Sequence, residues 1–324
     1  MMGVSLCMVR SSGRGYGKVI LFGEHFVVYG LPGIASGIDK FVEVTAENLE
    51  DSDEVIVVDN VYFNETVSSK TNPEHIKISG PEAMFKDEPE VDLKGLKLTY
   101  NGTLSKGGGL GFSAALGVAM ARAINNLYCL GWKDDKIFEV AMKWESIAHG
   151  TPSGIDPACA TYGSLIWFEK NMQGGKNRIQ PFSAGKPLLL VIGDTGVPRR
   201  TKEAVMAVRQ RKEENPEEYE KIFAEAEKIF YEAKSALESG EVTDLGKLMN
   251  KNQELLRRIG VSSPELETMI KTSIEKGALG AKLTGAGCGG NMIALCENEG
   301  VQDKIIYSLE QAGFKGIKVE INSL

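Results

Sequence analysis

The sequence predicts an α+β protein with two hydrophobic cores. Three observations support this prediction. Strand-like segments precede two helices in the first half, a long helical block occupies about residues 200–276, and strand-like segments return at the end of the chain. A chain of 324 residues is also longer than one small domain needs. We therefore expect two domains, each with its own strands and helices.

The first half of the chain begins with short strands. They are rich in β-branched and aromatic residues, and turn residues separate them. A fourth segment alternates apolar with polar residues, which is the pattern of a strand with one buried face. The expected strands are Tyr16–Phe22, Phe41–Ala46, Val55–Val58 and Leu96–Tyr100.

Two helices follow these strands. The segment Ser113–Tyr128 is apolar on nearly all sides, which predicts a buried central helix. A second helix runs from residue 134 to about 148, and either Asp134 or Asp135 can cap its first turn.

The composition changes after Phe168. The segment Glu169–Gly185 is polar and holds three glycines, so we expect a domain junction there and divide the chain into domains 1–180 and 181–324. The second domain begins with an apolar strand, Pro187–Ile192. Its helical block is clearest between Tyr219 and Leu237, where apolar residues recur at i, i+3 and i+4. A further helix starts at Ser263 and Pro264, and a last one spans about 300–312. The closing strands are Ala281–Thr284, Asn291–Cys296 and Ile317–Ile321.

Charge and composition exclude several classes of function. A net charge of −7 disfavours a nucleic-acid binder, and no apolar run is long enough to cross a bilayer. The N-terminus lacks the apolar core of a secretory signal. Five cysteines without a CxxC pair, together with three histidines, make a zinc site improbable. We therefore expect reduced thiols and a cytoplasmic protein that binds neither nucleic acid nor membranes.

Two common nucleotide-binding signatures are excluded. The chain contains no GxxxxGK[ST] segment, which excludes the standard P-loop. A GxGxxG pattern occurs at Gly285, Gly287 and Gly290, but a strand-like segment follows it. The dinucleotide-binding form of that pattern must open a helix, so this interpretation fails on its context.

The strongest local feature is the glycine-rich segment Lys106–Ser113, KGGGLGFS, which leads directly into the apolar helix. Consecutive glycines allow the backbone to approach a ligand closely, and free N–H groups at a helix start attract phosphate. The Ser113 hydroxyl can bind that phosphate or a Mg²⁺ ion that accompanies it. The alternative is a flexible turn with a serine cap. We expect the ring of Phe112 to pack into the domain core.

Three charged residues are further candidates, each with a structural alternative. Glu145 shares a helix face with apolar residues, so it is either exposed at a helix edge or a metal ligand. Asp156 ends the tight segment HGTPSGID and is either a rigidly held general base or part of a helix cap. Lys18 lies on a buried strand and either neutralises phosphate or extends along the surface to solvent.

Together these motifs resemble the GHMP kinases. In chain order they are KVILFGEH (18–25) followed by FVVYG (26–30), GGGLGFSAA (107–115), HGTPSGID (149–156) and KLTGAGCGG (282–290). The resemblance implies an N-terminal domain like domain 2 of ribosomal protein S5 and a C-terminal ferredoxin-like domain. Two departures stand out: Phe112 replaces the usual serine, and Gly15-Tyr16-Gly17 replaces Ala-Pro-Gly.

The resemblance also implies roles for individual residues. Asp156 is the expected catalytic base, with Lys18 beside it, and Ser113 with Glu145 is expected to hold Mg²⁺. The substrate side is expected to include Glu24, His25, Thr201 and Gly285, the last in a glycine-rich closing loop. The loop expected to bind the ATP phosphates consists of Lys106, Gly107, Gly108, Gly109, Leu110, Gly111, Phe112 and Ser113.

Within the family, the GEHxVVxG and HGTPSGxD forms are typical of members that phosphorylate the 5-hydroxyl of mevalonate with ATP, a step of isoprenoid precursor synthesis. Phosphomevalonate, homoserine or a sugar is the alternative acceptor, and Arg199, Arg200 and Lys202 could serve a phosphorylated one. A relative that binds small molecules without catalysis is a second alternative. The expected partners are the small molecules ATP and mevalonate, and a homodimer is the one assembly considered.

Overall fold

The computed structural model describes residues 8–104, 108–150, 152–198 and 201–321. It confirms the predicted α+β class and divides into two compact units. Unit 1 comprises residues 1–18 and 40–163, and unit 2 comprises residues 19–39 and 164–324. Strands β1 (Arg10–Phe22) and β2 (Gly33–Asn48) each contribute residues to both units. In the described chain, no helix is both long and apolar enough to span a bilayer.

The strands of unit 1 pair in a sheet that includes the second half of β2. This half pairs antiparallel with β5 (Leu96–Gly102), with Val44 opposite Tyr100. Strand β3 (Ile56–Asp59) runs parallel to β5 on its other side. The short β4 (Glu65–Ser68) then pairs with β3, so the order in this unit is β4-β3-β5-β2.

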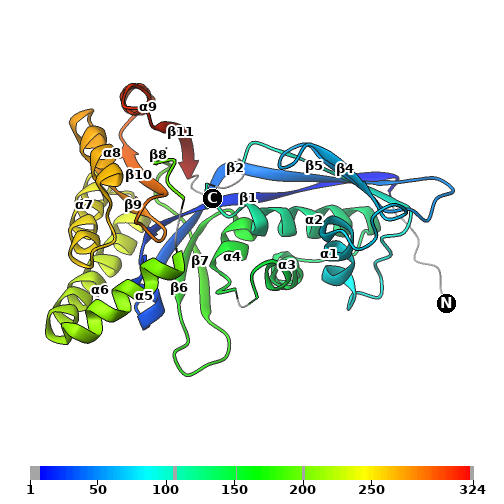
Figure 1. Ribbon diagram of the computed structural model, residues 1–324, viewed down its shortest axis with the longest axis horizontal. Helices are drawn as coiled ribbons and strands as arrows, with labels where there is room; N and C mark the ends of the chain where they lie inside the picture. Colours follow the sequence, from blue (N-terminus) through cyan, green and yellow to red (C-terminus); the bar gives the residue numbers. More distant parts are fainter. Residues whose placement is uncertain (1–7, 105–107, 151, 199–200, 322–324) are drawn as a thin grey trace. The chain divides into compact units, whose positions relative to one another are not determined.

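Among the described residues of unit 1, four helices lie on one face of its strands (Figure 1). Helix α2 is buried along most of its length, as its apolar sequence predicts. It lies directly against β1, because a Cβ atom at Gly15 would come within 2.0 Å of the carbonyl oxygen of Ala115. This close approach requires glycine where the family commonly has alanine. The helices are α1 (Ile76–Phe85), α2 (Phe112–Tyr128), α3 (Asp134–His149) and α4 (Ile155–Tyr162).

Unit 2 begins with the end of β1 and continues into the first half of β2. This half pairs with β6 (Leu165–Glu169), and β6 pairs with β7 (Arg178–Phe182), both antiparallel. The segment Glu169–Gly185, which we expected to be a domain junction, therefore contains the turn of a β-hairpin and its second strand, β7. A short 3₁₀ helix, η1 (Phe26–Tyr29), joins β1 to β2.

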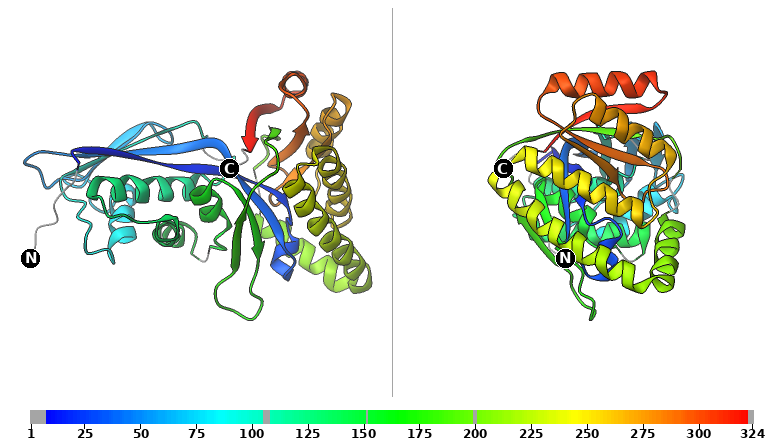
Figure 2. Two further views of the ribbon diagram at one scale, coloured as in Figure 1. Left: turned by 180° about the vertical axis from the view of Figure 1, so that it is seen from behind. Right: turned by 90° about the vertical axis from the view of Figure 1, so that its left-hand side faces the viewer.

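The rest of unit 2 is a four-stranded antiparallel sheet with helices packed on it (Figure 2). Its strand order is β11-β8-β10-β9, so β9 is an edge strand. The strands are β8 (Leu188–Asp194), β9 (Gly280–Thr284), β10 (Asn291–Cys296) and β11 (Lys315–Ile321). The helices are α5 (Thr201–Glu214), α6 (Pro216–Ser239), α7 (Val242–Arg258), α8 (Pro264–Glu275) and α9 (Glu299–Gln311).

Two local predictions are wrong. The residue that caps α3 is Lys133, which precedes both aspartates, so Asp134 and Asp135 lie in the first turn of the helix. Cys129 is disulfide-bonded, whereas Cys159, Cys288 and Cys296 are free thiols. The expectation of reduced thiols throughout is therefore wrong, because the lack of a CxxC pair does not exclude a disulfide.

Candidate active site

Lys18 and Asp156 meet within unit 1. The Lys18 Nζ atom lies 2.9 Å from Asp156 Oδ1. The lysine side chain is 12% exposed and the aspartate side chain 37%, so solvent reaches the pair from the carboxylate side. Asp156 lies in the first turn of α4, which begins after Gly154 in a left-handed backbone conformation. A carboxylate at a helix N-terminus is stabilised by the helix dipole, and here it also faces an ammonium group.

The glycine-rich loop lies against the same lysine. The backbone N–H of Lys18 donates a hydrogen bond to the carbonyl oxygen of Leu110 at 2.8 Å. Gly111 has a φ of 78°, and a Cβ atom there would come within 2.9 Å of the Lys18 side chain. Two of the predicted loop residues, Lys106 and Gly107, lie outside the described residues, whereas Gly108, Gly109 and Leu110 lead directly into α2. The loop and Lys18 therefore form one local structure at the N-terminus of α2, where free N–H groups favour anions.

Ser113 and Glu145 place two buried side-chain oxygen atoms beside this loop. Glu145 is only 4% exposed, which removes the alternative of an exposed helix edge. Its Oε1 atom and the Ser113 hydroxyl are both buried, and neither has a hydrogen-bond partner among the described residues. Unsatisfied buried oxygens are costly unless a ligand is bound. Mg²⁺ prefers oxygen ligands and often takes one or two protein ligands together with substrate phosphates, so these residues fit it.

The surroundings of Glu145 disfavour a negative charge that no cation balances. Burial raises the pKa of the Glu145 carboxyl above its ordinary value, and the negative charge of Asp156 raises it further. The nearby Ser113 hydroxyl, His149 and Lys18 act in the opposite direction. The His149 Nε2 atom lies 4.0 Å from Glu145 Oε1. A cation placed between these oxygens would favour the ionised carboxylate.

Phe112 does not pack into the core as predicted. It is partly exposed, and its ring stacks on Tyr62 with centroids 5.2 Å apart and an angle of 19°. Tyr62 comes from the turn after β3, where its backbone N–H donates to the Asp59 carboxylate at 2.7 Å. The Asp59 carboxylate is itself paired with Lys77. An aromatic stack thus occupies the position of the usual serine at the start of α2.

Glu24 and His25 lie in unit 2, in the turn between β1 and η1. Both are buried, with 2% and 7% exposure. His25 adopts a left-handed backbone conformation with a φ of 64°, which is strained for a residue with a Cβ atom. Its Nε2 atom lies 2.8 Å from the carbonyl oxygen of Ala286, and burial lowers its pKa. At neutral pH the ring is therefore uncharged.

This turn is anchored by contacts that the sequence reasoning missed. The side chain of Phe26 packs edge-on against Phe223 and Phe230 of α6. Lys282 of β9 is fully buried and forms an ion pair with Glu24. The available signal was the lysine that opens the KLTGAGCGG motif, which is unusual in the middle of an apolar strand.

The two remaining predicted residues occupy different settings. Gly285 directly follows β9, with a φ of 86°, at the start of the glycine-rich loop that contains Ala286. Thr201 is the first residue of α5 and is exposed. Its role in substrate binding stays a prediction.

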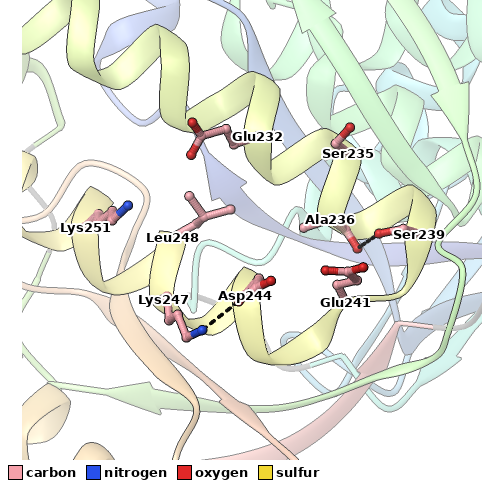
Figure 3. Close-up of a pocket in the computed structure, with 9 residues that line it drawn as sticks. All are labelled: Glu232, Ser235, Ala236, Ser239, Glu241, Asp244, Lys247, Leu248 and Lys251. Carbon is pink, nitrogen blue, oxygen red and sulfur yellow. Dashed lines mark hydrogen bonds and ion pairs between the residues drawn. The ribbon is translucent and has the colours of Figure 1, made fainter.

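A separate cavity of about 480 Å³ lies between α6 and α7 (Figure 3). Its lining carries both signs of charge, including Glu232 and Lys251, and Lys247 is paired with Asp244 at 2.7 Å. None of the motif residues lines it. We interpret it as a polar surface hollow.

Comparisons with known proteins agree over nearly the whole chain. Residues 81–164 match the family model described as GHMP kinases N terminal domain, and residues 233–315 match GHMP kinases C terminal. The mevalonate kinase of Pyrococcus furiosus is 35% identical, with 94% of each chain covered. The crystal structure of L. major mevalonate kinase in complex with R-mevalonate has a TM-score of 0.87 and 34% identity over 98% of each chain. That of the Methanococcus jannaschii mevalonate kinase has a TM-score of 0.81 and 25% identity, covering 97% of this chain and 98% of the other. The predicted two-domain α+β fold is thereby confirmed.

Proposed function

This chain belongs to the GHMP kinase family, and from that premise we propose that it transfers the γ-phosphoryl group of ATP to the 5-hydroxyl group of mevalonate. One observation supports the phosphoryl transfer itself: Lys18 Nζ lies 2.9 Å from Asp156 Oδ1, beside the glycine-rich loop of unit 1. The mevalonate kinases to which the chain is similar over nearly its full length support the acceptor.

Phosphoryl transfer to an alcohol requires a place for one proton and for developing negative charge. Asp156 accepts the hydroxyl proton as the alcohol oxygen forms its bond to the γ-phosphorus. The bond between that phosphorus and the bridging oxygen of ATP breaks, and ADP leaves with the bonding electron pair. The Lys18 ammonium stabilises the negative charge on the acceptor oxygen and the transferring phosphoryl group.

The phosphates of ATP are proposed to bind at the N-terminus of α2, where Gly108–Gly111 allow close approach of the backbone. Ser113 and Glu145 would hold Mg²⁺, which supplies positive charge to the β- and γ-phosphates when bound. The proposed metal-binding roles of Ser113 and Glu145 are supported by their buried oxygen atoms, which have no hydrogen-bond partner among the described residues.

The acceptor side is proposed to include Glu24, His25, Thr201 and the loop that begins at Gly285. A buried, uncharged imidazole and a buried carboxylate are suited to hydrogen bonds with hydroxyl groups. Arg199 and Arg200, two of the cationic residues that could serve a phosphorylated acceptor, lie outside the described residues, and Lys202 lies in α5. Mevalonate is favoured over phosphomevalonate by the similarity to mevalonate kinases over nearly the full chain. The cytoplasmic location and the homodimer stay predictions from the sequence.

A coupled ADP-release assay tests the proposal directly. Purified protein with ATP and Mg²⁺ is given mevalonate, phosphomevalonate, homoserine or galactose in separate reactions. We expect turnover with mevalonate to exceed that with every other acceptor. Equal or faster turnover with another acceptor would reassign the substrate, and no acceptor-dependent ADP release with any would favour a non-catalytic relative.

A further inference from the structure

Strand β9 and the loop after it contact the end of β1 and the turn that carries Glu24 and His25 at three positions. Lys282 forms its ion pair with Glu24. Thr284 donates a hydrogen bond to the carbonyl oxygen of Ile20 at 2.9 Å and accepts one from the Ile20 N–H at 3.2 Å. The carbonyl of Ala286 faces His25 Nε2 at 2.8 Å. Because alternate side chains of a strand face the same side, Lys282 and Thr284 reach Glu24 and Ile20 from one face of β9. The backbone carbonyl of Ala286, in the loop after β9, adds the contact to His25.

The strand itself is held firmly on its outer edge. As an edge strand, β9 would leave the N–H groups of Ala281 and Leu283 without partners in the sheet. The side chains of Asn250 and Gln253 on α7 accept both of these N–H groups at 3.0 Å. At Gly280, a Cβ atom would come within 2.1 Å of the Gly246 carbonyl oxygen, so α7 and β9 are in direct backbone contact. Lys282 therefore projects from a rigid support.

Burying the charged side chain of Lys282 at this position costs free energy. Its side chain and that of Glu24 are both 0% exposed, and its ammonium also donates to the Leu283 carbonyl oxygen at 2.8 Å. Burial lowers the lysine pKa, whereas the Glu24 carboxylate opposes that shift. A buried ion pair is often no more stabilising than apolar side chains of the same size. Stability alone therefore does not explain why a lysine occupies the centre of an apolar strand.

The environment of His25 specifies which nitrogen carries its proton. Nε2 faces a carbonyl oxygen, which can only accept, so Nε2 must donate. Burial and the positive charge of Arg211 both disfavour a second proton. Nδ1 is buried without a hydrogen-bond partner in the described part of the chain, and in this tautomer it is an acceptor.

We propose that Lys282 is a positioning residue of the acceptor site: through its ion pair with Glu24 it fixes the strained turn, and thereby holds His25 with its proton on Nε2 and the Nδ1 lone pair available to a hydroxyl group of the acceptor alcohol. The identity of the acceptor rests on the proposed function. The positioning of His25 by Lys282 does not.

The histidine spectra test the positioning without any assay of activity. The chain has only three histidines, so ¹⁵N-histidine labelling of the full-length protein gives a simple spectrum. In the wild type, we expect one histidine to stay neutral with its proton on Nε2. A His25→Gln protein identifies that signal. A wild-type His25 that is doubly protonated at neutral pH, or that carries its proton on Nδ1, would overturn the inference.

Lys282→Met and Glu24→Gln each remove the ion pair from one side. In both proteins we expect His25 to lose its single tautomer and to titrate more like an ordinary histidine. Since Glu24→Gln retains the lysine, it serves as the test if Lys282→Met does not fold. Unchanged His25 signals in a folded variant would show that the pair is merely structural.

Kinetics with the proposed substrates provide the second readout. Both variants should raise the KM for mevalonate by roughly 2- to 10-fold, the usual effect of losing a hydrogen bond between uncharged groups, while the KM for ATP stays the same. The double variant should be no worse than the more severe single one, since the residues act as one unit. Lys271→Met, on the exposed surface of the same unit, is the matched control. Additive losses, or a KM for mevalonate that does not change, would contradict the proposal. A protein that phosphorylates a different alcohol while its His25 behaves as described would refute the proposed function alone.

Discussion

Asp156 offers the sharpest test of the proposed chemistry, because its effects on catalysis and on stability differ in size. Removing a general base costs about 10²–10⁴-fold in rate, which corresponds to about 3–5 kcal/mol in the activation free energy. The ion pair with Lys18 is reached by solvent, with 37% of the aspartate side chain exposed, so its loss should lower stability by only about 1 kcal/mol. Asp156→Asn should therefore fold normally and turn over at least about 100-fold more slowly.

The measurement is steady-state ADP release at saturating ATP and mevalonate, with thermal unfolding followed by circular dichroism. The KM for ATP should change little, because the phosphate loop is intact. Asp134→Asn is a matched control: it removes a carboxylate that pairs with Arg122 at 2.8 Å in the same unit, and it should leave kcat unchanged. An Asp156→Asn protein that kept more than about a tenth of wild-type kcat would refute the base assignment.

Two further predictions concern the start of α2 and the residues around it. Glu145→Gln should lower ADP release by about 100-fold or more, since even partners outside the metal's ligand shell affect metal affinity by 10–100-fold. Because burial raises the pKa of the folded-state carboxyl, the same variant should melt at a higher temperature than the wild type at neutral pH without Mg²⁺. The difference in Tm should vanish as the pH falls through the raised pKa to the ordinary carboxyl range, where the wild-type Glu145 is protonated as well. If the variant and the wild type had the same Tm at neutral pH and at acidic pH, the assignment would be contradicted. Phe112→Ser should destabilise the protein by about 1–3 kcal/mol, less than a fully buried ring would cost. A double-mutant cycle with Tyr62→Ala should give a coupling of about 0.5–1.5 kcal/mol in urea unfolding, and a coupling near zero would show that the stack contributes nothing.

The sequence predicted best those elements whose apolar pattern is long and regular. Helix α2 is apolar all round and is indeed buried between β1 and α3, where a Cβ at Gly117 would come within 2.7 Å of Trp144. Helices α1 and α4 were missed. The first contains Pro81, and the second is short and directly follows the glycine-rich turn at Gly154. In both cases tertiary packing overrides weak local propensity.

The candidate site was predicted through motifs, and the errors arose where a contact depends on a distant segment. Phe112 was expected in the core because periodicity shows only which helix face is apolar. It does not show that the turn held by Asp59 brings Tyr62 against that ring. The ion pair between Lys282 and Glu24 joins residues 258 positions apart, and nothing in the local pattern of either segment indicates the other. Glu145 was left open between surface and ligand because its helix face is mixed, and only its burial distinguishes the two.

The division of the chain into units has a consequence for recombining it with relatives. Both units are discontinuous, and the boundary at residue 18/19 cuts through the first motif, leaving Lys18 in one unit and Glu24 in the other. A chimera made with a single crossover near residue 164 would thus take the Glu24–His25 turn from one parent and Lys282, Thr284 and Ala286 from the other. Interchange of whole units needs three crossovers, near residues 18, 39 and 163. In a chimera library with these three crossovers, both partners of each contact within a unit come from the same parent. A far larger fraction of its members should fold than in a library with a single crossover near residue 164.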